Sequence, residues 1–265
     1  MPNIDVNGTR LHYVEQGAGP ETVVFSHSYL LDGSHFKPQI ENFSNRYRCL
    51  AFDHRGHGGS DRPESGYDMD NLYADAVGFI EAMDCGPVHF VGLSTGGFIG
   101  LRIGFRRPDV LRTLTLMGTS AEPESPANRI KYEIMLRMVQ VIGVRPLAGY
   151  VMSLFFSKAS RSDPSRELEL RRFRQMIVDN DADSLVRFGR GIFGRQSVTE
   201  HLAGIDVPTQ VIVGSEDRSQ PPTQARRIAD RIPGAQLLII PGAAHVSTID
   251  APEEVNEALD NLWQR

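Results

Sequence analysis

The most constraining feature of this sequence is a series of short apolar runs, separated by segments with helical spacing. The runs cover Thr22–Phe25, Cys49–Phe52, Val88–Val91, Leu114–Met117, Gln210–Val213 and Leu237–Ile240. Short apolar runs of this kind are typical of strands that are buried on both faces of a parallel sheet. The chain is therefore expected to build most of its core around such a sheet.

Helical patterns fill the intervals between these runs. Leu72, Ala76, Phe79, Ile80 and Met83 recur at helical spacing, and Gly86-Pro87 ends that segment. Further helices are expected after Gly96, from about Pro221 to Arg231, and from about Pro252 onward. Strands that alternate with helices favour a parallel sheet with helices on both faces.

The first residues follow a different pattern. Ile4 and Val6 precede Asn7-Gly8, the pair favoured in a tight type I′ turn, and apolar residues alternate again after it. This pattern predicts an antiparallel hairpin over residues 4–16. The expected fold class is thus α/β, with a mostly parallel sheet and an antiparallel N-terminal hairpin.

The segment between Thr119 and about Leu202 interrupts the strand and helix rhythm. It has no convincing strand pattern, but Ile130, Ile134, Met138 and Ile142 form one apolar helical stripe. Ligands of open α/β sheets bind beyond the carboxyl ends of the strands. We therefore expect residues 119–202 to be an inserted helical cap over the site, and residues 1–118 and 203–265 to form the core domain.

Composition and charge narrow the functional classes. Hydrophobic residues make up 40% of the chain and charged residues 23%, which is typical of a folded globular protein. The net charge of −5 argues against a nucleic-acid partner. Neither a secretory signal nor an apolar run long enough to cross a bilayer is visible, and the two cysteines suggest no disulfide framework. A cytoplasmic protein is the expectation.

A candidate nucleophile follows the third apolar run. Val88–Val91 leads directly into Gly92-Leu93-Ser94-Thr95-Gly96-Gly97, and a helix is expected next. A serine on such a tight strand-to-helix turn projects its hydroxyl, and the helix N-terminus adds positive potential where negative charge develops. The glycines two residues before and after the serine leave room for the turn. The motif predicts a nucleophilic Ser94.

With this motif in place, the sequence resembles the α/β-hydrolase superfamily over nearly its full length. Within that superfamily it is most similar to small esterases, cofactor-free haloperoxidase-like enzymes and enol-lactonases. The matching segments are Phe25-Ser26-His27-Ser28, Phe52 to Ser60, Gly92–Gly97, Gly214–Asp217 and Gly242–His245. The resemblance implies the α/β-hydrolase fold and a serine, acid and histidine in that chain order.

The acid and the base follow the last two apolar runs. A carboxylate must orient the imidazole that takes the proton of the serine. Asp217 comes just after Gln210–Val213 and matches the acid position of the family, with Glu216 as the rival. His245 follows Leu237–Ile240 on a loop of small residues, and matches the base position. His27 is expected to shape a loop near the site, whereas His54 and His57 are expected in a structural turn.

Acyl transfer also requires donors for the negative charge that develops on the carbonyl oxygen. One donor should be the backbone N–H of Thr95, and the resemblance assigns the other to Tyr29. Ser28 stands where the family usually has glycine, which could strain the loop or simply be tolerated there. Leu30 stands where peracid-forming members tend to have proline, which lowers support for perhydrolase activity.

The cap and the neighbouring loops are expected to supply the substrate pocket. The candidate pocket residues are Ser28, Leu30, Met138, Phe155, Phe188 and Val246. The densest basic patch of the cap contains Arg166, Arg171, Arg172 and Arg174. These arginines are expected either to be solvated on helix faces or to include one that pairs with a substrate carboxylate.

Together these patterns predict a serine hydrolase that cleaves a small carboxylic ester or lactone through an acyl-enzyme intermediate. The alternatives are an enol-lactonase that acts on an anionic substrate, a perhydrolase or haloperoxidase-like enzyme, a C–C bond hydrolase, and a non-enzymatic small-molecule receptor. The expected partner is a small-molecule substrate, with neither nucleic acid nor membrane. A homo-oligomer is possible, and no metal or other cofactor is expected.

Overall fold

The computed structural model describes residues 2–264. Met1 and Arg265, at the outer limits of the predicted core domain, lie outside the described residues. Within the described part of the chain, no helix is both long and apolar enough to cross a membrane. Cys49 and Cys85 are both free thiols.

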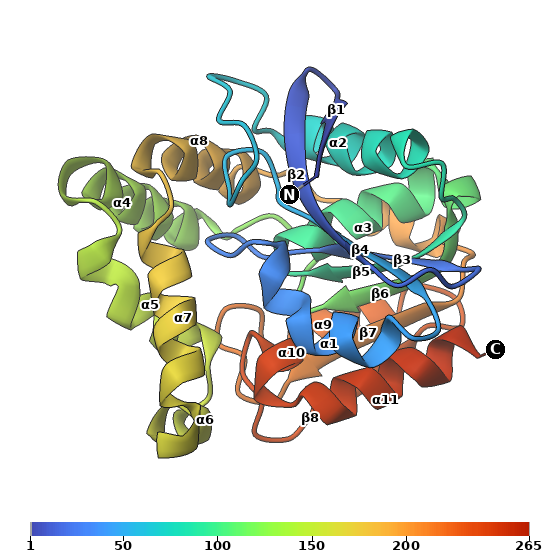
Figure 1. The fold of residues 1–265 in the computed structure, drawn as a ribbon. Coiled ribbons are helices and arrows are strands. Elements are labelled where there is room, and N and C mark those ends of the chain that lie inside the picture. The colour runs from blue at the N-terminus through green and yellow to red at the C-terminus, as the bar shows by residue number, and fades with distance from the viewer. Residues whose placement is uncertain (1, 265) are drawn as a thin grey trace.

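One sheet of eight strands lies at the centre of the described chain (Figure 1). The strands are β1 (Asn3–Val6), β2 (Thr9–Gln16), β3 (Thr22–Ser26), β4 (Arg48–Phe52), β5 (Val88–Leu93), β6 (Leu111–Met117), β7 (Thr209–Gly214) and β8 (Gln236–Ile240). Their order across the sheet is β1-β2-β4-β3-β5-β6-β7-β8. β2 is antiparallel to both β1 and β4, and all the other neighbouring strands are parallel.

Helices cover both faces of this sheet and gather beyond one end of it (Figure 1). They are α1 (Lys37–Phe43), α2 (Met69–Ala82), α3 (Thr95–Arg106), α4 (Pro126–Ile142), α5 (Ala148–Phe155), α6 (Lys158–Ser162), α7 (Glu167–Val178), α8 (Ala182–Phe193), α9 (Pro222–Ala229), α10 (Ser247–Asp250) and α11 (Pro252–Trp263). α1 and α11 pack on one face, whereas α2, α3 and α9 pack on the other. Short 3-10 turns occupy Gly33–Phe36, Pro108–Val110, Arg145–Leu147, Pro164–Arg166 and Thr199–Gly204.

The boundaries of these elements follow from local chemistry. Asn7 and Gly8 have φ values of 46° and 70°, as a type I′ turn requires, and they join β1 to β2. Asp68 caps α2 because its carboxylate accepts hydrogen bonds from the backbone N–H groups of Asp70 and Asn71. Pro252 occupies the first turn of α11, where its missing N–H leaves no helical bond unmade.

The predicted fold class is confirmed, and the structure corrects several details. Helix α1, which follows the 3-10 turn at Gly33–Phe36, was not predicted. β8 was expected to be buried on both faces, but most of its residues are only half-buried because it is the edge strand. Ile130, Ile134, Met138 and Ile142 form the exposed side of α4 and not its packed side.

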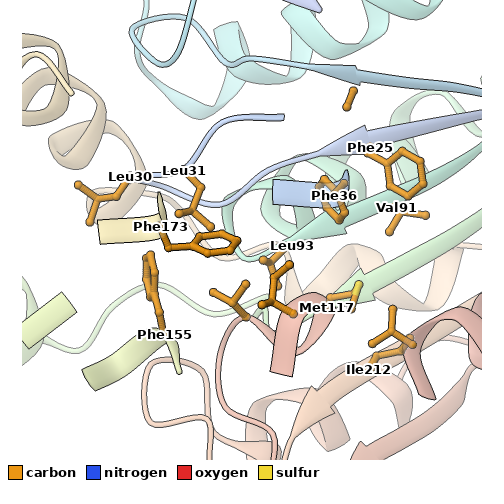
Figure 2. Packing of buried hydrophobic residues seen from close by; sticks show 14 of the residues in the cluster. Phe25, Leu30, Leu31, Phe36, Val91, Leu93, Met117, Phe155, Phe173 and Ile212 are labelled. Atoms are coloured by element: carbon orange, nitrogen blue, oxygen red, sulfur yellow. The ribbon is translucent and has the colours of Figure 1, made fainter. Parts of the chain in front are cut away.

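Two hydrophobic clusters hold the layers together, one on each face of the sheet. The cluster that contains α1 and α11 also extends beyond the strand ends to the helices of residues 126–193. Figure 2 shows Phe155 and Phe173 of these helices together with Leu30 and Leu31 of the loop after β3. Because parallel strands end at the same edge, the loops after β3, β5, β7 and β8 meet beneath these helices.

Candidate active site

Ser94 lies on a sharp turn between β5 and α3. Its φ of 54° and ψ of −104° are strained for a residue with a side chain. Its backbone N–H donates to the Met117 carbonyl of the neighbouring strand at 2.8 Å, and this bond helps to hold the turn. A Cβ at Gly92 would lie 2.3 Å from the backbone of Gly96, and one at Gly96 would lie 2.0 Å from the Ser26 carbonyl oxygen. The positions two residues before and two residues after the serine must therefore be glycine.

His245 and Asp217 form a buried hydrogen-bonded pair. The His245 Nδ1–H donates to Oδ2 of Asp217 at 2.8 Å, and both side chains are almost fully shielded from solvent. The second oxygen, Oδ1, accepts from the backbone N–H groups of Ser219 and Gln220, each at 2.8 Å. Three donors thus hold this carboxylate in a fixed orientation toward His245. Glu216, the rival acid, is exposed to solvent.

Gly118 packs directly against this pair. Its φ is +47°, and a Cβ there would lie 3.0 Å from Oδ2 of Asp217 and 3.2 Å from Nδ1 of His245. The end of β6 therefore needs a residue without a side chain. Nothing in the sequence analysis singled out this position, although a glycine that follows a predicted strand directly is a usable signal.

Two buried histidines hold the loop after β3. Nε2 of His27 accepts from the backbone N–H of His54 at 2.7 Å, and its Nδ1 donates to the Ser28 carbonyl at 2.8 Å. Nε2 of His57 accepts from the backbone N–H of Leu30 at 3.3 Å. Burial lowers the pKa of His57 to about 4, so the ring is neutral and can accept that bond.

The predicted oxyanion donors belong to the Ser94 turn (Thr95) and to the loop after β3 (Tyr29). Within the described residues, no acceptor is found for the backbone N–H of Tyr29 or for that of Thr95. The Tyr29 hydroxyl donates to the Leu185 carbonyl of α8 at 2.7 Å, which ties this loop to the helices above it. Strain in the loop falls on Leu30, whose φ is +71°, and not on Ser28.

A cavity of about 120 Å³ lies between the strand ends and α4, α5 and α8. Its lining residues are Ser28, Tyr29, Leu30, Ser94, Phe98, Glu124, Tyr132, Met135, Leu136, Val139, Val144, Leu147, Val151, Leu154, Phe155, Ile192, Phe193, Arg195, Ser219, Gln220 and His245. Ser94 and His245 thus face the same space. The volume is close to the roughly 150 Å³ of a cavity that admits benzene, so it suits a small ligand.

The candidate pocket residues divide into two groups. Ser28, Leu30 and Phe155 line this cavity. Met138, Phe188 and Val246 do not line it, so their assignment to the cavity is corrected. Met138 is 40% exposed on the outer side of α4. Phe188 is fully buried and stacks on Tyr29, and the Val246 N–H donates to the Phe155 carbonyl.

The arginines of the predicted basic patch lie elsewhere. Arg171 and Arg174 line a separate surface groove beside α6, and Arg172 lines another one near α1. Arg166 pairs with Glu169 and donates to the Ile249 carbonyl. The cavity instead contains Arg195, which sequence reasoning missed because nothing in its sequence context separates it from the other arginines of the segment.

Within the described residues, no group of three His, Cys, Asp or Glu side chains is arranged to hold a metal ion. The site brings together a hydroxyl on a strained turn and an imidazole that is hydrogen-bonded to a carboxylate. This combination is the arrangement used for nucleophilic acyl transfer.

Comparison with known proteins finds similar chains among hydrolases. The chain is 27% identical over 239 residues to 3-oxoadipate enol-lactonase 1 of Acinetobacter baylyi, covering 89% of this chain and 87% of that protein. The crystal structure of the enol-lactonase from Burkholderia xenovorans LB400 matches with a TM-score of 0.92 and 28% identity, over the whole of both chains. A thermophilic esterase from Thermogutta terrifontis matches with a TM-score of 0.92 and 25% identity, over 100% of this chain and 98% of that one.

Residues 23–258 match the family described as the alpha/beta hydrolase family. This match covers well over half of the chain, and it includes the Ser94 turn, Asp217 and His245. The chain therefore belongs to the alpha/beta hydrolase family.

Proposed function

We propose that this protein is a serine hydrolase that cleaves small carboxylic esters or lactones through an acyl-enzyme intermediate. The observation that carries the proposal is the buried 2.8 Å bond from His245 Nδ1 to Asp217, with His245 and Ser94 facing one small cavity. A carboxylate at Nδ1 fixes the proton there, so the lone pair of Nε2 is left to act as a base.

In the first half of the proposed cycle, the Ser94 Oγ attacks the carbonyl carbon while its proton passes to Nε2 of His245. The carbonyl oxygen becomes an oxyanion, and the N–H groups of Tyr29 and Thr95 donate to it. When the C–O bond breaks, the leaving alkoxide takes the proton from His245. The products of this half are an alcohol, or the free hydroxyl end of an opened lactone, and an ester on Ser94.

In the second half, a water molecule attacks the ester carbon and gives a proton to His245. The Ser94 oxygen leaves and recovers that proton, which releases the carboxylic acid. Removal of one oxyanion donor typically costs about 10²- to 10³-fold in rate, so the two N–H groups are a major part of the proposed rate enhancement.

We also propose that residues 119–202 act as a cap over a core formed by residues 1–118 and 203–265. Helices α4, α5 and α8 provide most of the apolar cavity wall, whereas the loops after the strands provide Ser94 and His245. The cap would exclude bulk water from the reacting atoms. The small volume of the cavity would limit the substrates to short acyl and alcohol groups.

Turnover of short-chain nitrophenyl esters and of simple lactones tests the proposed function. We expect wild type to hydrolyse several of them and Ser94→Ala to lose at least about 10³-fold in kcat/KM while it remains folded. Ser153→Ala is the matched control, since this serine lies outside the cavity. Tight binding of an ester without turnover would instead favour the receptor hypothesis, and full activity of Ser94→Ala would reject the nucleophile.

A further inference from the structure

A buried ion pair forms part of the wall of the Ser94 cavity. Nη1 of Arg195 lies 3.0 Å from Oε1 of Glu124, and only 3% and 9% of the two side chains are exposed. Both residues line the cavity together with Ser94 and His245. They are the only Lys, Arg, Asp or Glu residues among the described residues that line it.

The ion pair is held in a fixed position. Nη2 of Arg195 donates to the Ser120 Oγ at 2.9 Å, and Nη1 also donates to the Ile192 carbonyl at 3.1 Å. The guanidinium lies 3.9 Å above the ring of Phe98. Oε2 of Glu124 accepts from Nδ2 of Asn128 at 3.2 Å. Neither charged group can turn away from the cavity without breaking these contacts.

The same contacts connect the ion pair to the nucleophile. Phe98 lies one helical turn after Ser94, and its N–H donates to the Ser94 carbonyl at 3.0 Å. Thr119, which precedes Ser120, donates its hydroxyl to that same carbonyl at 2.9 Å. One helical turn rises about 5.4 Å, so a substituent a few carbons away from the scissile bond comes close to the pair.

The charges of the pair cancel within the cavity. A carboxylate on the substrate would lose its hydration there, and the repulsion from Glu124 would offset most of its attraction to Arg195. Burial also raises the pKa of Tyr132 to about 12, so this neighbouring wall residue adds no charge. An uncharged substrate loses much less on entry, because no ion has to be desolvated.

We propose that Glu124 is a specificity-determining residue that neutralises Arg195 and so restricts the cavity to uncharged esters or lactones. This inference rests on the proposed function and adds the charge class of its substrates. It also predicts that one substitution changes the charge of the substrates that the cavity accepts. Glu124→Gln would leave Arg195 without a counter-charge in the cavity, and the cavity would then accept a carboxylate at the far end of the substrate.

The test compares three methyl esters of similar size: methyl hexanoate, the methyl ester of glutaramic acid and monomethyl glutarate. They end in a methyl, an amide and a carboxylate, respectively. For wild type we expect kcat/KM of the carboxylate ester to be at least about tenfold below that of the amide ester. In Glu124→Gln the ratio of these two values should shift by at least about tenfold toward the carboxylate ester.

Glu133→Gln is the matched control, because Glu133 pairs with Arg190 and Arg137 outside this cavity. Its ratio should equal that of wild type. The double variant Glu124→Gln/Arg195→Met removes both charges, so it should keep the wild-type preference for uncharged esters. A purely structural role of the ion pair would lower all three activities together and leave the ratio unchanged.

Several results would overturn the inference. One is a wild type that hydrolyses the carboxylate ester as well as the amide ester, and this measurement needs no variant to fold. Another is an unchanged ratio in folded Glu124→Gln. If no ester of any charge is hydrolysed, the proposed function itself fails and the charge inference fails with it, whereas turnover without charge discrimination rejects the inference alone.

Discussion

At the scale of single residues, the two carboxylate oxygens of Asp217 accept hydrogen bonds from different partners. Oδ1 accepts from two backbone N–H groups, and Oδ2 accepts from His245. Asp217→Asn can keep both bonds to Oδ1, but it then turns an NH₂ group toward Nδ1 of His245 and favours the wrong tautomer. We expect kcat to fall by about 10³- to 10⁴-fold with little loss of stability.

Steady-state kinetics and thermal unfolding check this prediction. Glu216→Gln is its control, because Glu216 is the adjacent acid but is exposed to solvent. Its kcat should remain within about twofold of wild type. If Glu216→Gln were the more damaging variant, the assignment of the acid to Asp217 would be wrong.

The individual site residues differ in how well the sequence could predict them. Ser94, Asp217 and His245 each follow an apolar run closely, so strand position alone places them at one edge of the sheet. Glu124, Tyr132 and Arg195 come from helices and loops whose orientation depends on tertiary packing. No local pattern distinguishes Arg195 inside the cavity from Arg172 on the surface.

At the scale of secondary-structure elements, Asp250 joins the helical segment to the loop that carries His245. Its Oδ2 accepts from the N–H of Ser157 after α5 at 3.0 Å and from the N–H of Ala244 at 2.8 Å. Asp250→Ala would leave both of these donors without a partner, at a cost of about 1–3 kcal/mol for each buried one. We expect lower stability and a several-fold lower kcat, because the His245 loop loses one of its anchors.

Asp250→Asn is the matched control, since its single carbonyl oxygen can accept both bonds that Oδ2 accepts now. It loses only the 3.8 Å ion pair between Oδ1 and Nη1 of Arg166. The kcat of Asp250→Asn should be close to that of wild type, and the kcat of Asp250→Ala clearly below both. In urea unfolding, the stability of Asp250→Asn should lie between those of wild type and Asp250→Ala, because the ion pair with Arg166 is lost. Equal kcat values for the two variants would mean that these hydrogen bonds do not position His245.

The orientation of α4 shows what periodicity cannot decide. Apolar residues occur on several sides of this helix, so the stripe that contains Ile130 and Ile134 competes with one that contains Leu136 and Val139. The structure packs Leu136 and Val139 against the cavity and exposes the other stripe. A pattern with two apolar faces predicts that a helix forms, whereas the partner that covers it determines which face is buried.

At the scale of the whole molecule, the buried histidines His27, His35, His54, His57 and His89 link folding to pH. Burial lowers the pKa of His27, His35, His54 and His57, to about 3 for His35 and His54 and about 4 for His57. As the pH falls below about 6.5, the unfolded chain binds protons on these residues and the native protein does not. Stability is therefore present above pH 6.5 and is lost toward lower pH.

Each such histidine contributes about 1.4 kcal/mol per pH unit in this window, so four contribute about 5 kcal/mol per unit. Asp32 and Asp75, whose pKa values burial raises, and His12, whose pKa the hydrogen bond to Asp53 raises, act in the opposite direction. Burial also lowers the pKa of His89, which adds to the effect of the four. Total stabilities of about 5–15 kcal/mol are typical of a domain, so we expect acid unfolding to begin between about pH 6 and pH 4.

Urea unfolding at about pH 7, 6 and 5, with the fluorescence of Trp263 as the probe, measures the slope of the free energy of unfolding against pH. His35→Asn removes one of the four groups, and its amide can still donate to the Asp32 carbonyl as Nδ1 of His35 does at 3.0 Å. Its slope should fall by about 1.4 kcal/mol per pH unit. His201→Gln alters an exposed ring and should leave the slope unchanged. A wild-type stability that is flat from pH 7 to pH 5 would mean that the buried rings take up protons without unfolding, and the hydrogen bond from Leu30 to His57 would then need a different explanation.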